Sequence, residues 1–270
     1  LILFYFSFKN FRNSNSLDTK ILSFTFLQFF FVIISFLCLV FSFIISDFSN
    51  ETVFNNSHTT KPLFYKISGT WGNHEGSLLL WLLVLTLFIL VFLIRTVNQP
   101  IKYKILTLVF QQIIIIGFFI FLIKTSNPFN YLFPPPEEGL GLNPILQDPA
   151  LAIHPPILYL GYVGSSIIFS SVLSATVLKM ISSSWAVHIK NWILISWTFL
   201  TLGILLGSIW AYYELGWGGF WFWDPVENVS LMPWLALTTL LHCILVLERK
   251  SILTSWVIIL SVATFTLSMC

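Results

Sequence analysis

Long apolar runs separated by shorter polar segments dominate the sequence from end to end. A helix needs about 20 mostly apolar residues to cross the hydrocarbon core of a bilayer, so this pattern predicts an all-α polytopic membrane protein with about seven transmembrane helices. We expect one membrane domain over residues 1–270. The predicted spans are 21–46, 78–94, 105–123, 157–178, 192–210, 231–247 and 251–269.

The first run is longer than the apolar core of a signal peptide, and the stretch before it is polar, with Lys9, Arg12 and Lys20. We therefore expect this run to stay in the protein as an anchor.

The sequence starts with Leu1, and Cys270 ends an apolar run with no polar tail after it, so we expect the chain to be a piece of a longer protein.

The distribution of basic residues predicts that the N-terminus lies inside. Inner loops of membrane proteins carry an excess of Lys and Arg, and this orientation places ten of the 13 basic residues inside. Those ten are Lys9, Arg12, Lys20, Arg95, Lys102, Lys104, Lys179, Lys190, Arg249 and Lys250. The outer segments 47–77, 124–156 and 211–230 are long and rich in Pro, Gly and aromatic residues, so function is expected on the outer face.

Composition supports the membrane class and narrows the partners. Hydrophobic residues make up 57% of the chain and charged residues 9%, against about 25% charged in soluble domains. The basic residues form no patch that could follow a phosphate backbone, which argues against nucleic acid. The three cysteines lie in or at the end of apolar runs without a C-x-x-C pair and are interpreted as small hydrophobic residues.

The segment 217–228, Trp-Gly-Gly-Phe-Trp-Phe-Trp-Asp-Pro-Val-Glu-Asn, is the most specific in the chain. Its second half predicts a helix start, because Asp224, Pro225 and Glu227 match an N-cap, a proline in the first turn and a capping-box acid. Its aromatic half has two interpretations. Tryptophans gather in belts at membrane interfaces, but the number crowded into 210–234 is larger than a belt needs and suits a planar apolar macrocycle such as a porphyrin.

The histidines supply candidate iron ligands for such a macrocycle. His154 precedes Pro155 and Pro156 at the outer end of the fourth span and is either a haem ligand or a helix-start histidine at the interface. His242 lies about 20 Å into the membrane from Asn228. It is either bonded to a neighbouring helix or ligates a membrane-embedded haem, and in both cases it is expected to face protein.

The other histidines have weaker patterns. His74 is interpreted as part of the solvated start of the second span, and His58 and His188 receive no role. Motifs of soluble hydrolases and phosphate loops are missing from the sequence. A transporter is disfavoured because the spans carry few polar groups besides His242, Gln28, Gln111 and Gln112.

The segment 217–228 resembles the WWD signature of the haem-handling superfamily that includes CcmF, CcmC, NrfE and CcsA-type proteins. The segments 71–81, with its His-Glu-Gly-Ser core, and 142–164, with Leu-Asn-Pro-Ile-Leu-Gln-Asp-Pro followed by His-Pro-Pro, are similar to CcmF-type haem lyases and their close relative NrfE. The resemblance runs from about residue 64 to 270, and it identifies the WWD-type segment as residues 210–234.

This resemblance implies a lyase that receives haem from a CcmE-type chaperone and joins it through thioether bonds to an apocytochrome c presented by a CcmH-type protein. His154 then ligates the delivered haem and His242 ligates a permanent b haem that keeps the delivered iron ferrous with electrons from a quinol. The implied reaction site is His154, Trp217, Trp221, Trp223 and Asp224. The implied haem-holding residues are Trp210, Gly218, Gly219, Phe220 and Trp234.

Two departures from the family pattern matter. Phe220 stands where the family often has Trp, which keeps an aromatic face but removes an N–H donor. The family also continues with further spans and a second histidine for each haem, so this chain is expected to need a C-terminal half, on a separate polypeptide or missing, before it can catalyse ligation. A non-catalytic haem-binding or structural subunit is the alternative.

The expected location is the mitochondrial inner membrane facing the intermembrane space, or else a bacterial inner membrane facing the periplasm.

Overall fold

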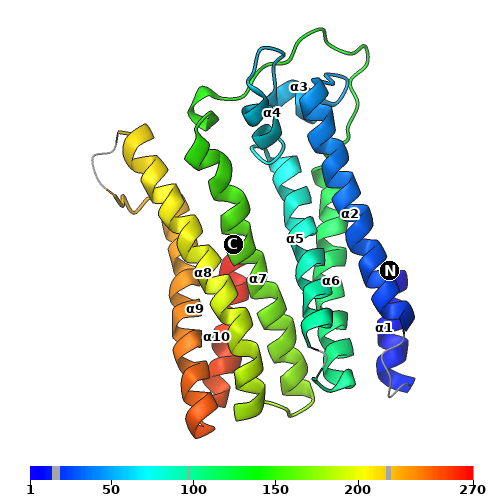
Figure 1. Ribbon diagram of the computed structural model, residues 1–270, viewed down its shortest axis with the longest axis vertical. Helices are drawn as coiled ribbons and strands as arrows, with labels where there is room; N and C mark the ends of the chain where they lie inside the picture. The colour runs from blue at the N-terminus through cyan, green and yellow to red at the C-terminus, as the bar shows by residue number, and fades with distance from the viewer. Residues whose placement is uncertain (14–18, 97, 217–219, 270) are drawn as a thin grey trace.

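The computed structural model describes residues 1–13, 19–96, 98–216 and 220–269, and helices dominate this part of the chain. The long helices run side by side, as Figure 1 shows. The helices in chain order are α1 (Ile2–Asn13), α2 (Thr19–Ile45), α3 (Glu51–Asn56), α4 (Leu63–Gly69), α5 (His74–Arg95), α6 (Ile101–Thr125), the 3-10 helix η1 (Pro144–Leu146), α7 (Pro149–Val177), α8 (Ser183–Glu214), α9 (Pro225–Lys250) and α10 (Thr254–Met269).

The two ends of the bundle differ. At one end, α3, α4 and the segment 126–148 lie at the same end of the bundle as the last turn of α8 and the first turn of α9 (Figure 1), and we call this the loop end. At the other end, short turns join α5 to α6, α7 to α8 and α9 to α10, and we call this the turn end. The long segments and the short turns predicted from the sequence thus lie at opposite ends.

The prediction of an all-α polytopic membrane protein is confirmed. Among the described residues, six helices are long and apolar enough to cross a membrane: α2, α5, α6, α7, α8 and α9. The seventh predicted span forms the shorter helix α10, whose 16 residues cover about 24 Å at 1.5 Å per residue. Its described end lies near mid-height of the bundle in Figure 1. The sequence therefore predicted seven full spans, whereas six described helices are long enough to cross a membrane.

Three helices extend well beyond their predicted spans, because the predicted spans counted only apolar residues while capping sets the helix ends. The helix expected at 157–178 begins at Pro149, directly after the N-cap Asp148, whose side chain accepts a hydrogen bond from the Leu151 amide. The helices expected at 192–210 and 231–247 extend over Ser183–Glu214 and Pro225–Lys250. The stretch before the first span is also helical: α1 packs against α6.

Helices α7 and α8 lie in close backbone contact. A Cβ atom added to Gly161 of α7 would lie 2.5 Å from the Leu200 amide nitrogen of α8. From the other side, a Cβ on Gly203 would lie 2.7 Å from the Leu158 Cα atom. Small residues at such positions let transmembrane helices approach closely without a hydrophobic driving force between them. These two glycines therefore set the distance between α7 and α8.

Buried amide and hydroxyl groups connect α2, α6 and α7 inside the apolar bundle. Gln28 and Gln112 exchange two amide hydrogen bonds, of 3.1 and 2.9 Å. Gln111 donates to the Ser166 hydroxyl and accepts from the Ser170 hydroxyl, both at 2.9 Å. Interhelical bonds of this kind fix helix register in a membrane. These polar residues of the spans thus hold helices together.

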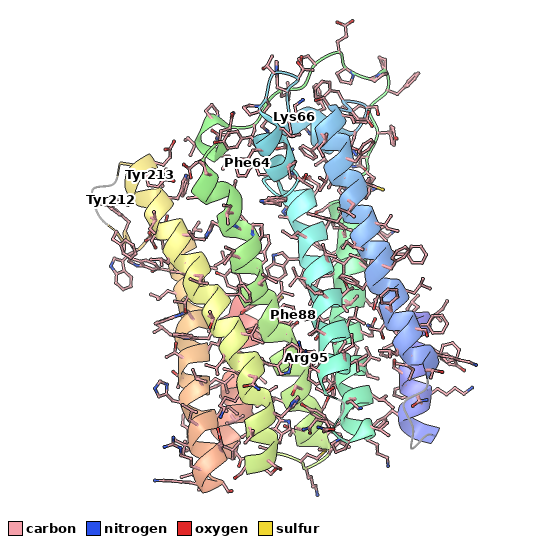
Figure 2. All side chains as sticks on the ribbon, in the orientation of Figure 1. Phe64, Lys66, Phe88, Arg95, Tyr212 and Tyr213 are labelled. Atoms are coloured by element: carbon pink, nitrogen blue, oxygen red, sulfur yellow. The ribbon has the colours of Figure 1, made fainter. Side chains whose placement is uncertain are left out.

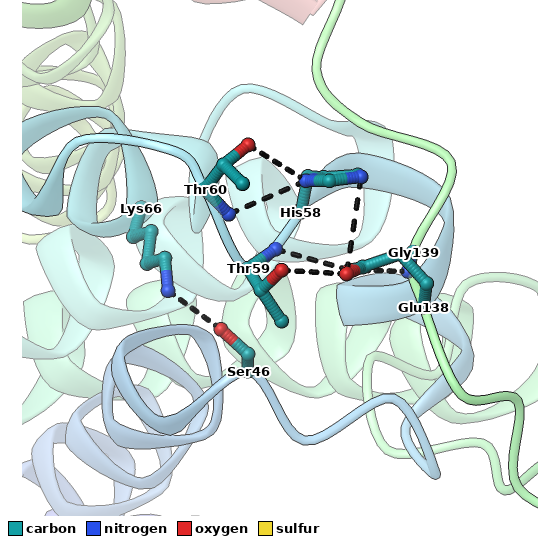
Figure 3. Close-up of polar contacts among 7 residues, drawn as sticks. All are labelled: Ser46, His58, Thr59, Thr60, Lys66, Glu138 and Gly139. Atoms are coloured by element: carbon teal, nitrogen blue, oxygen red, sulfur yellow. Dashed lines mark hydrogen bonds and ion pairs between the residues drawn. The ribbon is translucent and has the colours of Figure 1, made fainter.

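At the loop end, one carboxylate connects segments that are far apart in the sequence. Glu138 accepts hydrogen bonds from the Thr59 amide and hydroxyl and from the Gly139 amide, and it lies 3.9 Å from the His58 ring (Figure 3). These bonds, led by the Thr59 hydroxyl, lower the pKa of the Glu138 carboxyl. In the same view, the Lys66 ammonium donates to the Ser46 hydroxyl and ties α4 to the end of α2.

We expect Glu138→Gln to expose the Thr59 amide, since the neutral side chain offers one acceptor oxygen in place of two. The pKa of the Glu138 carboxyl is lowered in the folded protein. Its contribution to the stability of the folded state is therefore fully present above the unfolded pKa of about 4.3, and it is lost as the pH falls through the folded pKa. Hydrogen-exchange protection of the Thr59 amide measures both effects. Glu137→Gln is the control, and equal protection in both variants contradicts the prediction.

Candidate functional site

A cavity of about 330 Å³ opens between α7, α8 and α9 near the loop end. Its wall combines four of the residues singled out from the sequence, which come from three different elements: His154, Trp210, Trp221 and Asp224. Apolar side chains such as Leu158 and Ile204 form much of the remaining wall. A small apolar cavity with a few convergent polar groups is the usual form of a ligand site.

The first turns of α7 carry His154 and contain two prolines. Because Pro155 and Pro156 have no amide hydrogen, the carbonyls of Leu151 and Ala152 lose their intrahelical donors. The Trp71 indole Nε1 donates to the Ala152 carbonyl at 2.8 Å and replaces one of them. The segment before α5 therefore stabilises the part of α7 that positions His154.

A second contact holds the start of α7 against α8. The Tyr213 hydroxyl donates to Asp148 Oδ1 at 2.6 Å, and Asp148 is the N-cap of α7. Tyr213 and its neighbour Tyr212 lie at the loop end of α8 (Figure 2). The start of α7 is thus connected to α8 and to the segment between α4 and α5.

The His154 ring is turned toward α8. Its Nδ1 atom lies 2.7 Å from the Gly203 carbonyl oxygen, which only accepts, so Nδ1 carries the proton and Nε2 keeps its lone pair. Nε2 makes no hydrogen bond to any described residue. A backbone carbonyl on one ring nitrogen is the usual support of a histidine that ligates a metal through the other nitrogen.

Gly207 makes room for this ring. A Cβ atom on Gly207 would lie 2.7 Å from His154 Cε1 and 3.1 Å from Nδ1. The position of His154 therefore depends on two glycines of α8, one that supplies a carbonyl and one that supplies space.

Two indole groups of the cavity wall lack a hydrogen-bond partner among the described residues. The Nε1 atoms of Trp210 and Trp221 are both buried and unpaired, and so is Oε1 of Glu227. Buried polar atoms in folded proteins nearly always have a partner. The cavity wall is therefore equipped to bind a molecule that has both an apolar body and polar groups.

The prediction that Asp224 caps α9 is confirmed. Its Oδ1 atom accepts from the Glu227 amide at 2.6 Å, and Pro225 is the first helical residue. The acid of the predicted capping box bonds elsewhere, because Glu227 Oε2 accepts from the Phe222 amide at 2.7 Å. Glu227 thereby fastens the aromatic segment to the start of α9.

Other residues proposed from the sequence do not line this cavity. Phe220 and Trp223 are 54% and 69% exposed, and Trp223 contacts Trp221 edge-on. Trp234 lies between α8 and α9, where its Nε1 donates to Thr201 at 2.8 Å and its ring stacks on Trp197. Trp217, Gly218 and Gly219 lie outside the described residues.

His242 lies on the exposed side of α9. The buried positions of this helix, among them Leu237, Leu240 and Ile244, follow helical spacing and define the opposite side. The His242 Nδ1 atom lies 2.8 Å from the Thr238 carbonyl, so Nε2 is again left with its lone pair. The expectation that His242 faces protein is not met within this chain.

The remaining histidines fall in three settings. His58 bonds Thr60 and approaches Glu138 in the loop region. His74 begins α5 after the N-cap Asn73 and is exposed, as expected for the solvated start of a span, and it also lines a second cavity of about 340 Å³. His188 was given no role from the sequence, but its Nε2 is buried and has no hydrogen-bond partner among the described residues. Its spacing from the buried Trp185 and Trp192 was the signal that could have placed it on an inner face.

A preformed site for a bare metal ion is not found in the described part of the chain, where no three His, Cys, Asp or Glu side chains cluster. His154 is a single nitrogen ligand in an aromatic and aliphatic wall. This donor set fits an iron ion whose other nitrogen ligands belong to a planar macrocycle.

The sequence model of the family described as Cytochrome C assembly protein matches residues 71–270. The chain belongs to this cytochrome c assembly family. Both the aromatic segment and the first turns of α7 fall within the matched range.

The similarity extends to individual members. The cytochrome c-type biogenesis protein CycK of Rhizobium meliloti (strain 1021) is 53% identical over 238 residues, which are 88% of this chain and 35% of that protein. CcmF of Haemophilus influenzae (strain ATCC 51907 / DSM 11121 / KW20 / Rd) is 46% identical over 235 residues, 87% of this chain and 36% of that protein. A solved structure, Cytochrome c Heme Lyase CcmF, superposes with a TM-score of 0.85 at 29% identity, covering 99% of this chain and 43% of that one.

These comparisons confirm the resemblance to CcmF-type proteins. The chain spans little more than a third of the length of the curated family members described above. The chain is thus similar to a part of these longer proteins. Both of these family members are bacterial.

We expect Trp71→Phe to destabilise the protein, because the Ala152 carbonyl would lose the donor that replaces the Pro156 amide. Leaving a buried acceptor unpaired costs about 1–3 kcal/mol. Thermal unfolding in detergent checks this, with Trp256→Phe in α10, where the ring is 56% exposed, as the control. An unchanged midpoint in both variants contradicts the prediction.

We also expect Gly207→Ala to move the His154 ring away from the Gly203 carbonyl, because the added methyl group overlaps the ring. A tautomer-sensitive ¹⁵N spectrum of the histidines should show the Nδ1-protonated signal of His154 lost, while that of His242, which bonds Thr238 in α9, stays. Gly117→Ala is the matched control, since no atom lies within 4 Å of a Cβ atom at that glycine of α6. A His154 signal that survives Gly207→Ala would show that the ring does not depend on this space.

Proposed function

We propose that the chain is part of a haem lyase that holds haem at the loop end and attaches it covalently to apocytochrome c. The observation that carries the proposal is the His154 ring, whose Nε2 has no hydrogen-bond partner among the described residues in a cavity lined by Trp210 and Trp221. The family membership and the solved neighbour, whose printed name is a haem lyase, support it.

In this proposal the delivered haem is a substrate. His154 ligates its iron through Nε2 while the Gly203 carbonyl keeps the ring in the required tautomer. The Trp221 and Trp210 rings, which line the cavity, contact the porphyrin. The exposed Trp223 and Phe220 extend the apolar surface next to it. Asp224 contributes by starting α9 at the place that aligns the aromatic segment with His154.

The covalent step joins two cysteine thiols of the apocytochrome to the two vinyl groups of the haem. In each addition the S–H bond and the π bond of the vinyl group break, a bond forms between sulfur and one vinyl carbon, and the thiol hydrogen goes to the other carbon, so the step needs no external oxidant or reductant. The described residues supply the binding and orientation that bring two reactants together. We propose that the haem arrives from a CcmE-type chaperone and that a CcmH-type protein presents the apocytochrome.

His242 is proposed as one ligand of a permanent b haem. Its Nε2 atom keeps its lone pair, and its side of α9 is exposed. This arrangement fits a haem held between α9 and the remaining part of the lyase, which would contribute the second ligand. When bound, such a haem supplies electrons that keep the delivered iron ferrous.

We infer that the loop end faces outward and the turn end inward. The turn end carries most of the basic residues, including Arg95, Lys102 and Lys190, which is the pattern of an inner side. We propose the mitochondrial inner membrane as the location, with the cavity toward the intermembrane space. A bacterial inner membrane, with the cavity toward the periplasm, is the alternative and is supported by the bacterial relatives.

Replacing each histidine in the assembled lyase tests the proposal. We expect His154→Ala to lower holocytochrome c formation by at least about 10–100-fold, the range for losing the hydrogen-bond partner of a metal ligand, and added imidazole to restore part of it. We expect His242→Ala to remove a low-spin b-haem signal from the purified complex. His58→Ala, at the loop end but outside the cavity, is the control.

The same measurements separate a lyase from a non-catalytic haem-binding subunit. A subunit of that kind would keep its haem spectrum in the assembled complex, but holocytochrome c formation would not respond to His154→Ala. Purified complexes without any haem signal would sink both versions.

A further inference from the structure

A third cavity lies toward the turn end, away from the candidate haem site. Its volume is about 560 Å³, and α5, α7 and α8 form its walls. Figure 2 shows two of its lining residues, Phe88 and Arg95, on the half of α5 nearer the turn end. Neither the family resemblance nor the proposed lyase chemistry makes use of this cavity.

The cavity wall is polar near the turn end and apolar toward the middle of the bundle. Arg95 is the last residue of α5, and His188 lies near the start of α8. Leu87 lies eight positions before Arg95 in the sequence, which corresponds to about 12 Å along the helix. The apolar lining consists of Leu87, Phe88, Val91, Leu160, Trp192 and Ile195. A ligand that fits this lining has a polar head at the membrane surface and a hydrocarbon tail.

The polar groups of the wall lack partners among the described residues. Nε2 of His188 is buried without a hydrogen bond to a described residue, while its ring lies in T-shaped contact with Phe92 and Tyr103. The exposed Arg95 forms neither an ion pair nor a hydrogen bond within the described part of the chain. A buried unpaired nitrogen needs a partner that the protein does not supply, and an unpaired guanidinium favours an anion, to which it can donate two hydrogen bonds.

We propose that this cavity binds an anionic phospholipid. Its phosphate accepts hydrogen bonds from Arg95 and from His188 in the Nε2-protonated form, and one acyl chain lies along Phe88, Val91 and Leu160. Charge complementarity selects this occupant over a neutral amphiphile, because a guanidinium at the membrane surface attracts anionic lipids. The lipid fills the space that α7 leaves between α5 and α8, and it does so independently of the haem chemistry.

The purified complex provides the test. It is reconstituted in nanodiscs of phosphatidylcholine with a minor fraction of phosphatidylglycerol, and the phosphatidylglycerol retained after transfer to detergent is measured by native mass spectrometry. We expect Arg95→Gln to lower the retained phosphatidylglycerol about fivefold and Val91→Phe, which fills the apolar part without changing charge, to lower it as well. Lys102→Gln is the matched control, since Lys102 is an exposed basic residue at the same end outside the cavity lining.

Three results would overturn the proposal. Equal losses in Arg95→Gln and Lys102→Gln would show general surface attraction in place of a site. A neutral isoprenoid quinone recovered from the wild-type complex and lost in Val91→Phe would identify a different class of ligand. Equal retention of phosphatidylcholine and phosphatidylglycerol by the wild type would remove the charge argument. His188→Phe keeps the ring shape, so a loss of lipid in this variant with an unchanged unfolding midpoint separates binding from folding.

Discussion

The close approach of α7 and α8 is the contact on which the candidate site depends. Gly161 and Gly203 bring the two backbones together, and only at that distance can the His154 ring reach a carbonyl of the neighbouring helix. A larger residue at either position would separate the helices and leave the ring nitrogen without its acceptor. Since lipid tails are as apolar as the side chains they touch, packing of small residues is what drives such a contact.

Much of the fold was readable from hydropathy, because every apolar run long enough to span a bilayer has to hydrogen-bond its own backbone as a helix. Helix ends were not readable in the same way. The predicted start at 157 missed the first turns of α7, where Pro155 and Pro156 interrupt the hydrogen-bond ladder but Trp71 compensates for one lost donor. That compensation joins residues 81 positions apart, which no local pattern reveals. The helix cap at Asp224 was readable, since all of its signals lie within four residues.

The candidate site was predictable in its residue types but only partly in its geometry. His154 and Trp221 share a cavity, as the haem interpretation requires, whereas Trp234 bonds Thr201 between α8 and α9. A tryptophan count cannot separate an indole that lines a cavity from one that joins two helices. His242 shows the same limit, because its depth in the span was predictable from the sequence while the side of the helix it occupies depends on how α9 packs. The unpaired nitrogen of His188 appears only once α5, α6 and α8 are placed around it.

The contact between Trp71 and Ala152 also bears on how the chain is assembled. A carbonyl whose amide partner is replaced by a proline is costly to transfer into lipid. The first turns of α7 therefore insert poorly into a membrane by themselves. Trp71 precedes Ala152 in the chain, and synthesis from the N-terminus therefore delivers the replacement donor before the segment that needs it. The order of residues in the sequence thus provides for the insertion of the helix that carries His154.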